Sequence, residues 1–175
     1  MRRIISMLLQ NEAGALARVA GLFAARGYNI DSLTVAPTHD ASVSRLTLVT
    51  AGDDAVIEQI VKQSRKLIDV LEIADLTGSA HLESELLLVK LELDPTLPDA
   101  LAGFVAFLRR HPRAQVLDIG AGVRTIEYAG NGMEVEAFLD GLAPIGRVFE
   151  LARSGTAALE RGAVVLAPAG PVPGS

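Results

Sequence analysis

The sequence NEAGAL at residues 11–16 separates a short apolar run from a segment with helical periodicity, and it decides how the N-terminal half folds. Residues 2–9, which precede it, are mainly apolar and predict a buried strand. After it, apolar residues recur every three or four positions, which predicts a helix with one buried face. These positions are Leu16, Val19, Ala20, Leu22 and Phe23. We therefore expect a strand, a glycine-containing loop and a helix whose N-terminus is open to solvent.

An open helix N-terminus is a candidate binding site for a carboxylate, because its first N–H groups lack partners within the helix and carry partial positive charge. Gly14 has no Cβ, so a small anion can approach the backbone closely. Asn11 and Asn29 flank the site, and each amide can accept from an ammonium group and donate to a carboxylate. This combination indicates a sensor of a free amino acid rather than a catalyst. The alternative is that both asparagines only form turns, for which the residue is well suited.

The predicted elements follow the order β-α-β-β-α-β twice. Two units of about 75 residues each fit this order, so the fold class is α+β with two tandem ferredoxin-like domains. In the first half, we expect strands at 28–35 (with a bulge at Asp31-Ser32), 43–50 and 70–76, and a second helix capped by Asp53 or Asp54. In the second half, we expect strands at 86–93, 115–119, 123–128 and 147–152, with one helix opened by Pro95 and Pro98 and another around Val135–Leu142.

The predicted boundaries are 1–78 for the first domain, 79–83 for a linker, 84–162 for the second domain and 163–175 for a flexible tail rich in proline, glycine and alanine. The element order places both helices on one face of a four-stranded antiparallel sheet, so the other face is solvated or covered by a partner. The strand from Ile4 to Leu9 is apolar on both sides, which favours a covered face and a homodimer.

The composition excludes several classes of function. The net charge of −5 disfavours nucleic acid or an anionic membrane as a partner. Aromatic residues make up only 4% of the chain, which predicts an aliphatic core. The absence of cysteine excludes disulfides and thiolate chemistry and is compatible with a cytoplasmic location. No segment is long enough to span a bilayer, and the apolar run after Arg2-Arg3 is too short for an export signal.

No catalytic or metal site is expected. The three histidines, His39, His81 and His111, have no partner at metal-ligand spacing and are expected in solvated loops. The sequence VLDIGAG at 116–122 is similar to the first motif of S-adenosylmethionine methyltransferases, in which the glycines open a helix. Here an alternating, β-branched segment follows, so a hairpin turn between two strands is favoured.

Several stretches of the first 83 residues resemble the small regulatory subunit of acetolactate synthase (acetohydroxyacid synthase). The matching stretches include NEAGAL at 11–16, GLF at 21–23, RGYNI at 26–30, SLTVAPT at 32–38 and KLIDVL at 66–71. The resemblance weakens across 91–125 and returns at AFL, 137–139, and ELARSG, 150–155. The segment Asp94–Arg113 departs from the usual second-domain helix, and His39, Ala41 and Ser84 are further departures.

The resemblance implies an N-terminal ACT domain that dimerises and binds valine between two subunits. Asn11 would hold the polar head of the effector, and Gly14, Ala15 and Leu16 would offer backbone N–H groups to its carboxylate. Asn29 and Ile30 would come from the neighbouring subunit.

The family's small subunit activates a large catalytic subunit, which carries thiamine diphosphate, Mg²⁺ and FAD, and confers feedback inhibition by valine in branched-chain amino acid biosynthesis. The small subunit itself is non-catalytic and holds no cofactor. The sequence leaves open whether the effector is valine, leucine or isoleucine, which surface contacts the catalytic subunit, and the stoichiometry. The alternative function is a stand-alone ACT-type amino-acid sensor that serves another enzyme or a regulator.

Overall fold

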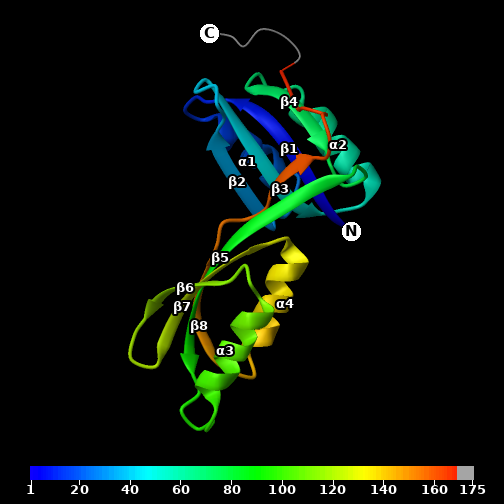
Figure 1. The fold of residues 1–175 in the computed structure, drawn as a ribbon. Coiled ribbons are helices and arrows are strands. Elements are labelled where there is room, and N and C mark those ends of the chain that lie inside the picture. Colours follow the sequence, from blue (N-terminus) through cyan, green and yellow to red (C-terminus); the bar gives the residue numbers. More distant parts are fainter. Residues whose placement is uncertain (169–175) are drawn as a thin grey trace. The chain divides into compact units, whose positions relative to one another are not determined.

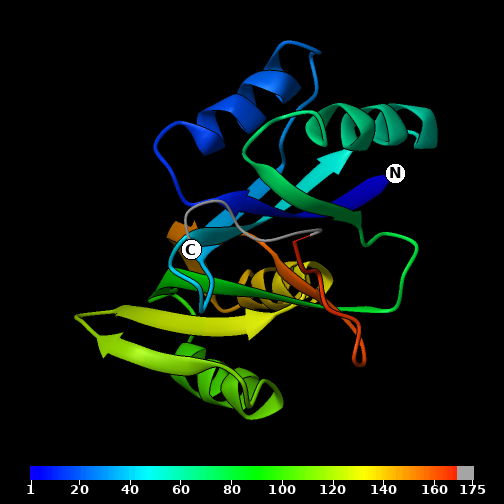
Figure 2. The ribbon, with the colours of Figure 1, turned by 90° about the horizontal axis from the view of Figure 1, so that it is seen from above.

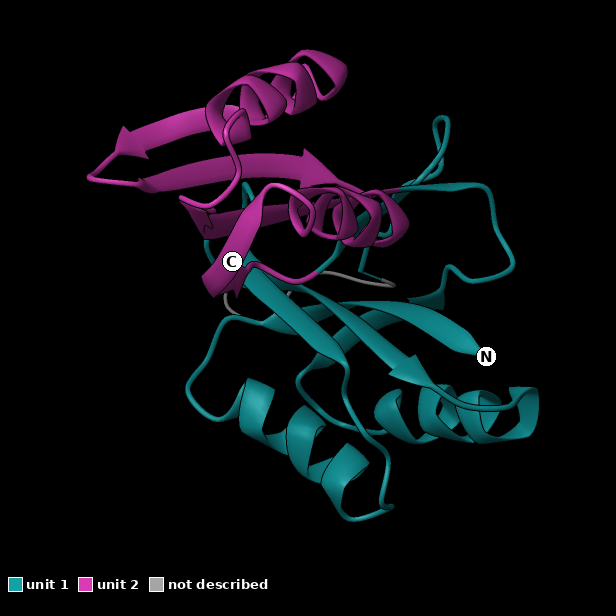
Figure 3. Cartoon of the chain, turned by 90° about the horizontal axis from the view of Figure 1, so that it is seen from below, with its two compact units in different colours: residues 1–82, 156–175 teal, residues 83–155 magenta. Residues whose placement is uncertain are grey.

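The chain forms two compact units in the computed structural model, which describes residues 1–168. The first unit comprises residues 1–82 together with the chain from residue 156 onward, and the second comprises residues 83–155 (Figure 3). The division differs from the predicted boundaries, because the C-terminal segment returns to the first unit. Of the tail predicted at 163–175, residues 169–175 lie outside the described residues.

The first unit has the predicted order of elements, and both helices lie on one face of its sheet (Figures 1 and 2). Its four strands are antiparallel in the order β2-β3-β1-β4. The elements are β1 (Arg2–Gln10), α1 (Ala15–Ala24), β2 (Ser32–Pro37), β3 (Val43–Ala51), α2 (Asp54–Ser64) and β4 (Val70–Asp75). The strand predicted at 28–35 is shorter at its start than expected and runs on to Pro37. Asp53 caps α2 as predicted, accepting a hydrogen bond from Val56 N at 2.9 Å.

The core of the first unit lies between the sheet and its two helices. Alternate residues of β1 point into it, since successive side chains of a strand face opposite sides. Ile5, Met7 and Leu9 pack there against Val19 and Phe23 of α1. The core is aliphatic apart from Phe23, with Tyr28 packed at its edge, in agreement with the low aromatic content.

The opposite face of this sheet is covered in part by the chain itself. A short strand that the sequence did not predict, β9 (Ala157–Glu160), pairs with β5. Ala158 of β9 joins a buried cluster with Ile4, Val49 and Leu76. We predicted that this face of the sheet would be covered. The expectation that a partner covers it was wrong for this cluster, because Ala158 of the same chain does so. Homodimerisation therefore stays a prediction that rests on the family alone.

The second unit repeats the βαββαβ plan in a sheet of order β6-β7-β5-β8. Its elements are β5 (His81–Leu93), α3 (Ala100–Arg110), β6 (Gln115–Ile119), β7 (Val123–Gly130), α4 (Gly132–Leu142) and β8 (Gly146–Arg153). Because β5 begins at His81, the segment predicted as a linker is partly strand. Together, the two units confirm the predicted fold class.

The core of the second unit combines aliphatic and aromatic side chains, so the prediction of an aliphatic core holds here only in part: four of its eleven buried residues carry aromatic rings. The rings of Tyr128 and Phe138 are stacked with centroids 4.2 Å apart, and Phe107 lies 5.0 Å from Phe138. His111 joins this cluster, its ring centroid 4.2 Å from that of Phe107 and its Nδ1 within 3.0 Å of the carbonyl of the same residue. His111 follows α3 in a loop, as expected, but this ring packing leaves it only partly exposed, so the expectation that it is solvated was wrong.

The glycines at 120–122 form a hairpin turn, as the alternation of the following residues predicted. They connect β6 to β7, and Gly122 adopts φ 80°, a left-handed conformation that glycine tolerates well. Since no helix starts at this turn, the methyltransferase alternative was wrong.

Candidate effector site

The loop before α1 has the geometry that the sequence predicted around Gly14. Gly14 adopts φ 90° and ψ −13° immediately before the helix, and no side chain caps the helix N-terminus. Leu16 is exposed in the first turn, whereas Ala15 is buried. The N–H of Ala15 donates to the carbonyl of Glu12 at 3.3 Å. One of the three backbone N–H groups predicted to bind the effector's carboxylate therefore already makes a long hydrogen bond within the loop.

Asn11 has a structural role in this loop. Its Nδ2 donates to the carbonyl of Ala41 at 2.8 Å, and its Oδ1 accepts from Ser44 Oγ at 3.0 Å. These bonds tie the loop to the start of β3. An amide side chain has two N–H groups and an oxygen with two lone pairs, so further bonding capacity remains for a ligand. Both interpretations of Asn11 are thus compatible, and its ligand role stays a prediction.

Sequence reasoning missed a cation beside Gly14. Arg18 lies four residues later on α1, and a Cβ added at Gly14 would be 2.9 Å from Arg18 Nη1. The guanidinium is held by Asp69 through Nε–Oδ2 at 2.5 Å and Nη2–Oδ1 at 2.7 Å. The spacing of four along a helix could have indicated Arg18. Its pairing with Asp69, far along the chain and just before β4, could not have been read from either segment alone.

This ion pair is half-open to solvent. The Asp69 side chain is only 3% exposed, whereas that of Arg18 is 47% exposed. Hydrogen bonding from Arg18 holds the pKa of Asp69 below its ordinary value, and the same bond raises the pKa of Arg18. The arrangement fixes α1 against the start of β4, and it leaves positive charge at the mouth of the Gly14 loop.

We expect Asp69→Asn to destabilise the protein at pH 7 and to have much less effect in acid. A carboxyl whose pKa is lowered by folding stabilises the native state above its unfolded pKa of about 3.9, and this contribution is lost as the pH falls through the folded value. Urea unfolding at pH 7 and pH 3 measures the difference. Glu58→Gln is the control, because Glu58 pairs with Lys62 at the surface. Equal destabilisation by Asp69→Asn at both pH values would contradict the linkage.

Asn29 and Ile30 lie at the other end of the sheet from Gly14. The end of β1, Gln10, pairs with Val43, whereas Asp31 N donates to the carbonyl of Val49, six residues further along β3. At about 3.4 Å per residue, the two ends are separated by roughly 20 Å. Asn29 Nδ2 donates to Asp31 Oδ1 at 2.7 Å, and Ile30 packs against its own core. One chain does not bring the two halves of the predicted site together.

The described part of the chain, residues 1–168, contains no group of three or more His, Asp or Glu side chains arranged to hold a metal ion. Within the same residues, no helix has the length and apolarity needed to cross a membrane.

Two family models match the chain. The first, described as an AHAS small subunit-like ACT domain, matches residues 5–72, so the chain carries a domain of the ACT class. The second, described as the small subunit of acetolactate synthase, matches residues 84–162.

Relatives and a solved structure are similar over nearly the whole chain. The acetolactate synthase isozyme 3 small subunit of Escherichia coli (strain K12) is 45% identical over 162 residues, which cover 93% of this chain and 97% of the relative. The probable acetolactate synthase small subunit of Archaeoglobus fulgidus is 40% identical, with 93% and 98% covered. The crystal structure of the acetolactate synthase small subunit from Thermotoga maritima superimposes with a TM-score of 0.80 at 33% identity, covering 94% of this chain and 99% of that one. The chain therefore belongs to the acetolactate synthase small-subunit family, which confirms the resemblance found in the sequence.

Proposed function

We propose that this chain is the regulatory subunit of an acetolactate synthase: it activates a separate catalytic subunit and confers feedback inhibition by valine. Family membership supports a catalytic partner, and a match to the family's second domain at 84–162 favours this function over a stand-alone sensor. Thiamine diphosphate, Mg²⁺ and FAD would belong to the catalytic subunit. This chain would contribute binding and conformational change only.

The main support for the effector site is the structure of the loop at Gly14. A left-handed glycine leads directly into an uncapped helix N-terminus, and a half-exposed guanidinium lies beside it. Helix dipole and guanidinium charge both favour an anion there. In this proposal, the carboxylate of valine binds to the backbone N–H groups of the first turn of α1, and Asn11 contacts its polar head.

The separation of Asn29 from Gly14 supports a pocket built by two subunits. If two ACT domains pair so that the start of β2 in one subunit meets the α1 loop of the other, Asn29 and Ile30 close the pocket across the dimer. A ligand that contacts both chains favours the dimer geometry in which those contacts form. Allosteric coupling of about 1–3 kcal/mol is typical and is sufficient for strong inhibition.

Reconstitution with the catalytic subunit from the same source tests the proposal. We expect the chain to raise acetolactate formation and valine to reduce it, with leucine and isoleucine as comparison effectors. Absence of activation would overturn the regulatory function. Activation without a response to any branched-chain amino acid would overturn only the effector part.

We expect Asn29→His to weaken inhibition by valine by roughly ten-fold or more, because a larger ring replaces an amide that faces the ligand. Titration of the reconstituted enzyme with valine measures the effect. Asp31→Ala is the matched control, since it removes the hydrogen-bond partner of Asn29 and leaves the Asn29 amide in place. An unchanged valine titration for Asn29→His would exclude Asn29 from the pocket.

A further inference from the structure

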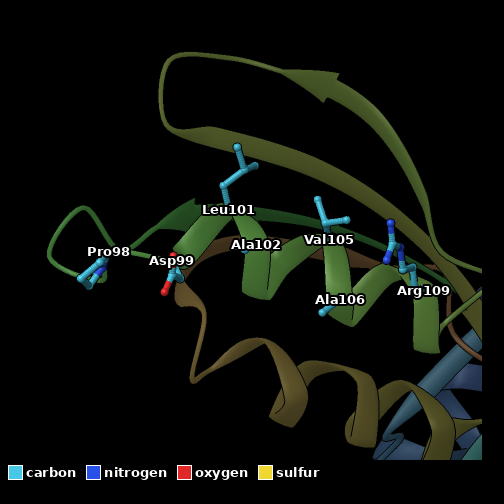
Figure 4. Close-up of a pocket in the computed structure, with 7 residues that line it drawn as sticks. All are labelled: Pro98, Asp99, Leu101, Ala102, Val105, Ala106 and Arg109. Carbon is cyan, nitrogen blue, oxygen red and sulfur yellow. The ribbon is translucent and has the colours of Figure 1, made fainter.

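One face of α3 is apolar and exposed, although the other face supplies Phe104 and Phe107 to the core. Leu101 is 56% and Val105 is 41% exposed. With the alanines between them, they border a shallow hollow of about 520 Å³, shown with its side chains in Figure 4. The hollow is lined by Pro98, Asp99, Leu101, Ala102, Val105, Ala106 and Arg109. Ala102, Val105 and Arg109 follow one another at intervals of three and four, so they form one stripe along the helix, with Leu101 at one edge and Asp99 and Ala106 at the other.

The charges at the two ends of this stripe are opposite. Asp99 is the N-cap residue of α3, but its side chain makes no capping hydrogen bond. Arg109 lies in the last turn and is exposed. Among the described residues, neither side chain has a salt-bridge partner, whereas Arg113, just beyond the helix, is paired with Glu134.

We propose that the α3 stripe pairs with the same stripe of a second copy of this chain, with the two helices antiparallel about a two-fold axis that passes midway between Ala102 and Ala106, one residue from Val105. In this arrangement, Asp99 of each copy meets Arg109 of the other, because both lie five residues from position 104 on the helix. An isologous contact of this kind places each residue pair twice across the axis. Ala102 and Ala106 allow the helices to approach closely, and the leucine and valine side chains leave water.

The size of the stripe determines how strong the contact is. An 11-residue helix is about 16 Å long, so one face buries much less than the roughly 800 Å² per partner of a stable complex. The α3 contact is therefore weak alone, and it pairs copies most effectively at high protein concentration or within a larger assembly. The contact does not depend on valine binding.

Disulfide trapping in the full chain tests the proposal cleanly, because the sequence has no cysteine of its own. Val105→Cys places a thiol near the proposed axis, within the Cα–Cα reach of about 4.4–6.8 Å that a disulfide requires. Ala137→Cys, on the exposed side of α4, is the control for random collision. We expect mild oxidation to give at least five-fold more cross-linked pairs from Val105→Cys than from Ala137→Cys. Equal yields from the two variants would overturn the proposal.

Charge reversal in the Val105→Cys background tests the register. We expect Asp99→Arg or Arg109→Asp alone to lower the cross-linked yield several-fold, and the two together to restore it. Single reversals without effect would overturn the antiparallel pairing. Cross-linking only to the catalytic subunit of a reconstituted holoenzyme, when that subunit carries a cysteine, would also overturn it and would assign the stripe to that subunit.

Discussion

Replacing Gly14 with aspartate is expected to abolish inhibition by valine and to leave activation of the catalytic subunit intact. The new carboxylate would lie beside Arg18, because a Cβ at this position is already 2.9 Å from Arg18 Nη1. It would thus occupy the place proposed for the carboxylate of the effector and neutralise the nearby cation. The left-handed backbone adds a strain of about 1–2 kcal/mol, which is small compared with the stability of most domains.

The control for this variant is Gly21→Asp on the same helix. A Cβ at Gly21 meets nothing within 4 Å, so the charge is added without a clash and away from the loop. Assays of the reconstituted enzyme with and without valine measure both properties. Gly14→Asp with a wild-type valine response would refute the site. Loss of activation as well, with a normally folded protein, would show that the loop serves the catalytic contact instead.

The second large effect is expected from Arg153→Ala, which breaks a partly buried ion pair in the second unit. Arg153 Nε and Nη2 bond Glu85 at 2.5 and 3.1 Å, and Nη1 bonds Glu136 at 2.5 Å. The Glu85 side chain is only 4% exposed, and its hydrogen bonds raise the pKa of Arg153. Removing the arginine leaves a buried carboxylate unpaired. The expected loss is about 2–3 kcal/mol, below the full value for deep burial because Arg153 itself is partly exposed.

Arg147→Ala is the matched control, since Arg147 lies on the same strand and pairs with a glutamate of β5, but at the surface. Surface pairs contribute about 1 kcal/mol or less. Urea unfolding followed by circular dichroism compares the variants, and Arg153→Ala with Glu85→Gln should recover part of the loss. Equal destabilisation by the two arginine variants would show that burial of Glu85 does not matter. Arg153, the last residue of β8, thus supplies a stabilising ion pair to the second unit.

The local parts of the fold could be predicted from the sequence because local chemistry determines them. Hydrophobic periodicity placed the helices, the cap of α2 was expected at Asp53 or Asp54, and the glycines at 120–122 were identified as a turn. The loop at Gly14 was predicted for the same reason. The exact extent of the strand before Pro37 could not be predicted. Pairing with β3, rather than the residues of β2 themselves, decides where β2 begins.

The missed features depend on residues that are distant in the sequence. Asp69 fixes the position of the Arg18 side chain, although the two residues are 51 positions apart in the sequence. Phe104, Tyr128 and Phe138 come from three elements, and only packing brings them together in the core of the second unit. Strand β9 is four residues long, and a segment that short has too little periodicity to identify it.

The return of the chain to the first unit after residue 155 has a consequence for biosynthesis. During translation, residues 1–82 emerge before the strand that covers Ile4 and Val49, because β9 follows the whole second unit in the sequence. The nascent first unit therefore leaves the ribosome with an apolar surface uncovered until the second unit and β9 have been synthesised. A chaperone that binds exposed aliphatic segments would have its longest opportunity during that interval.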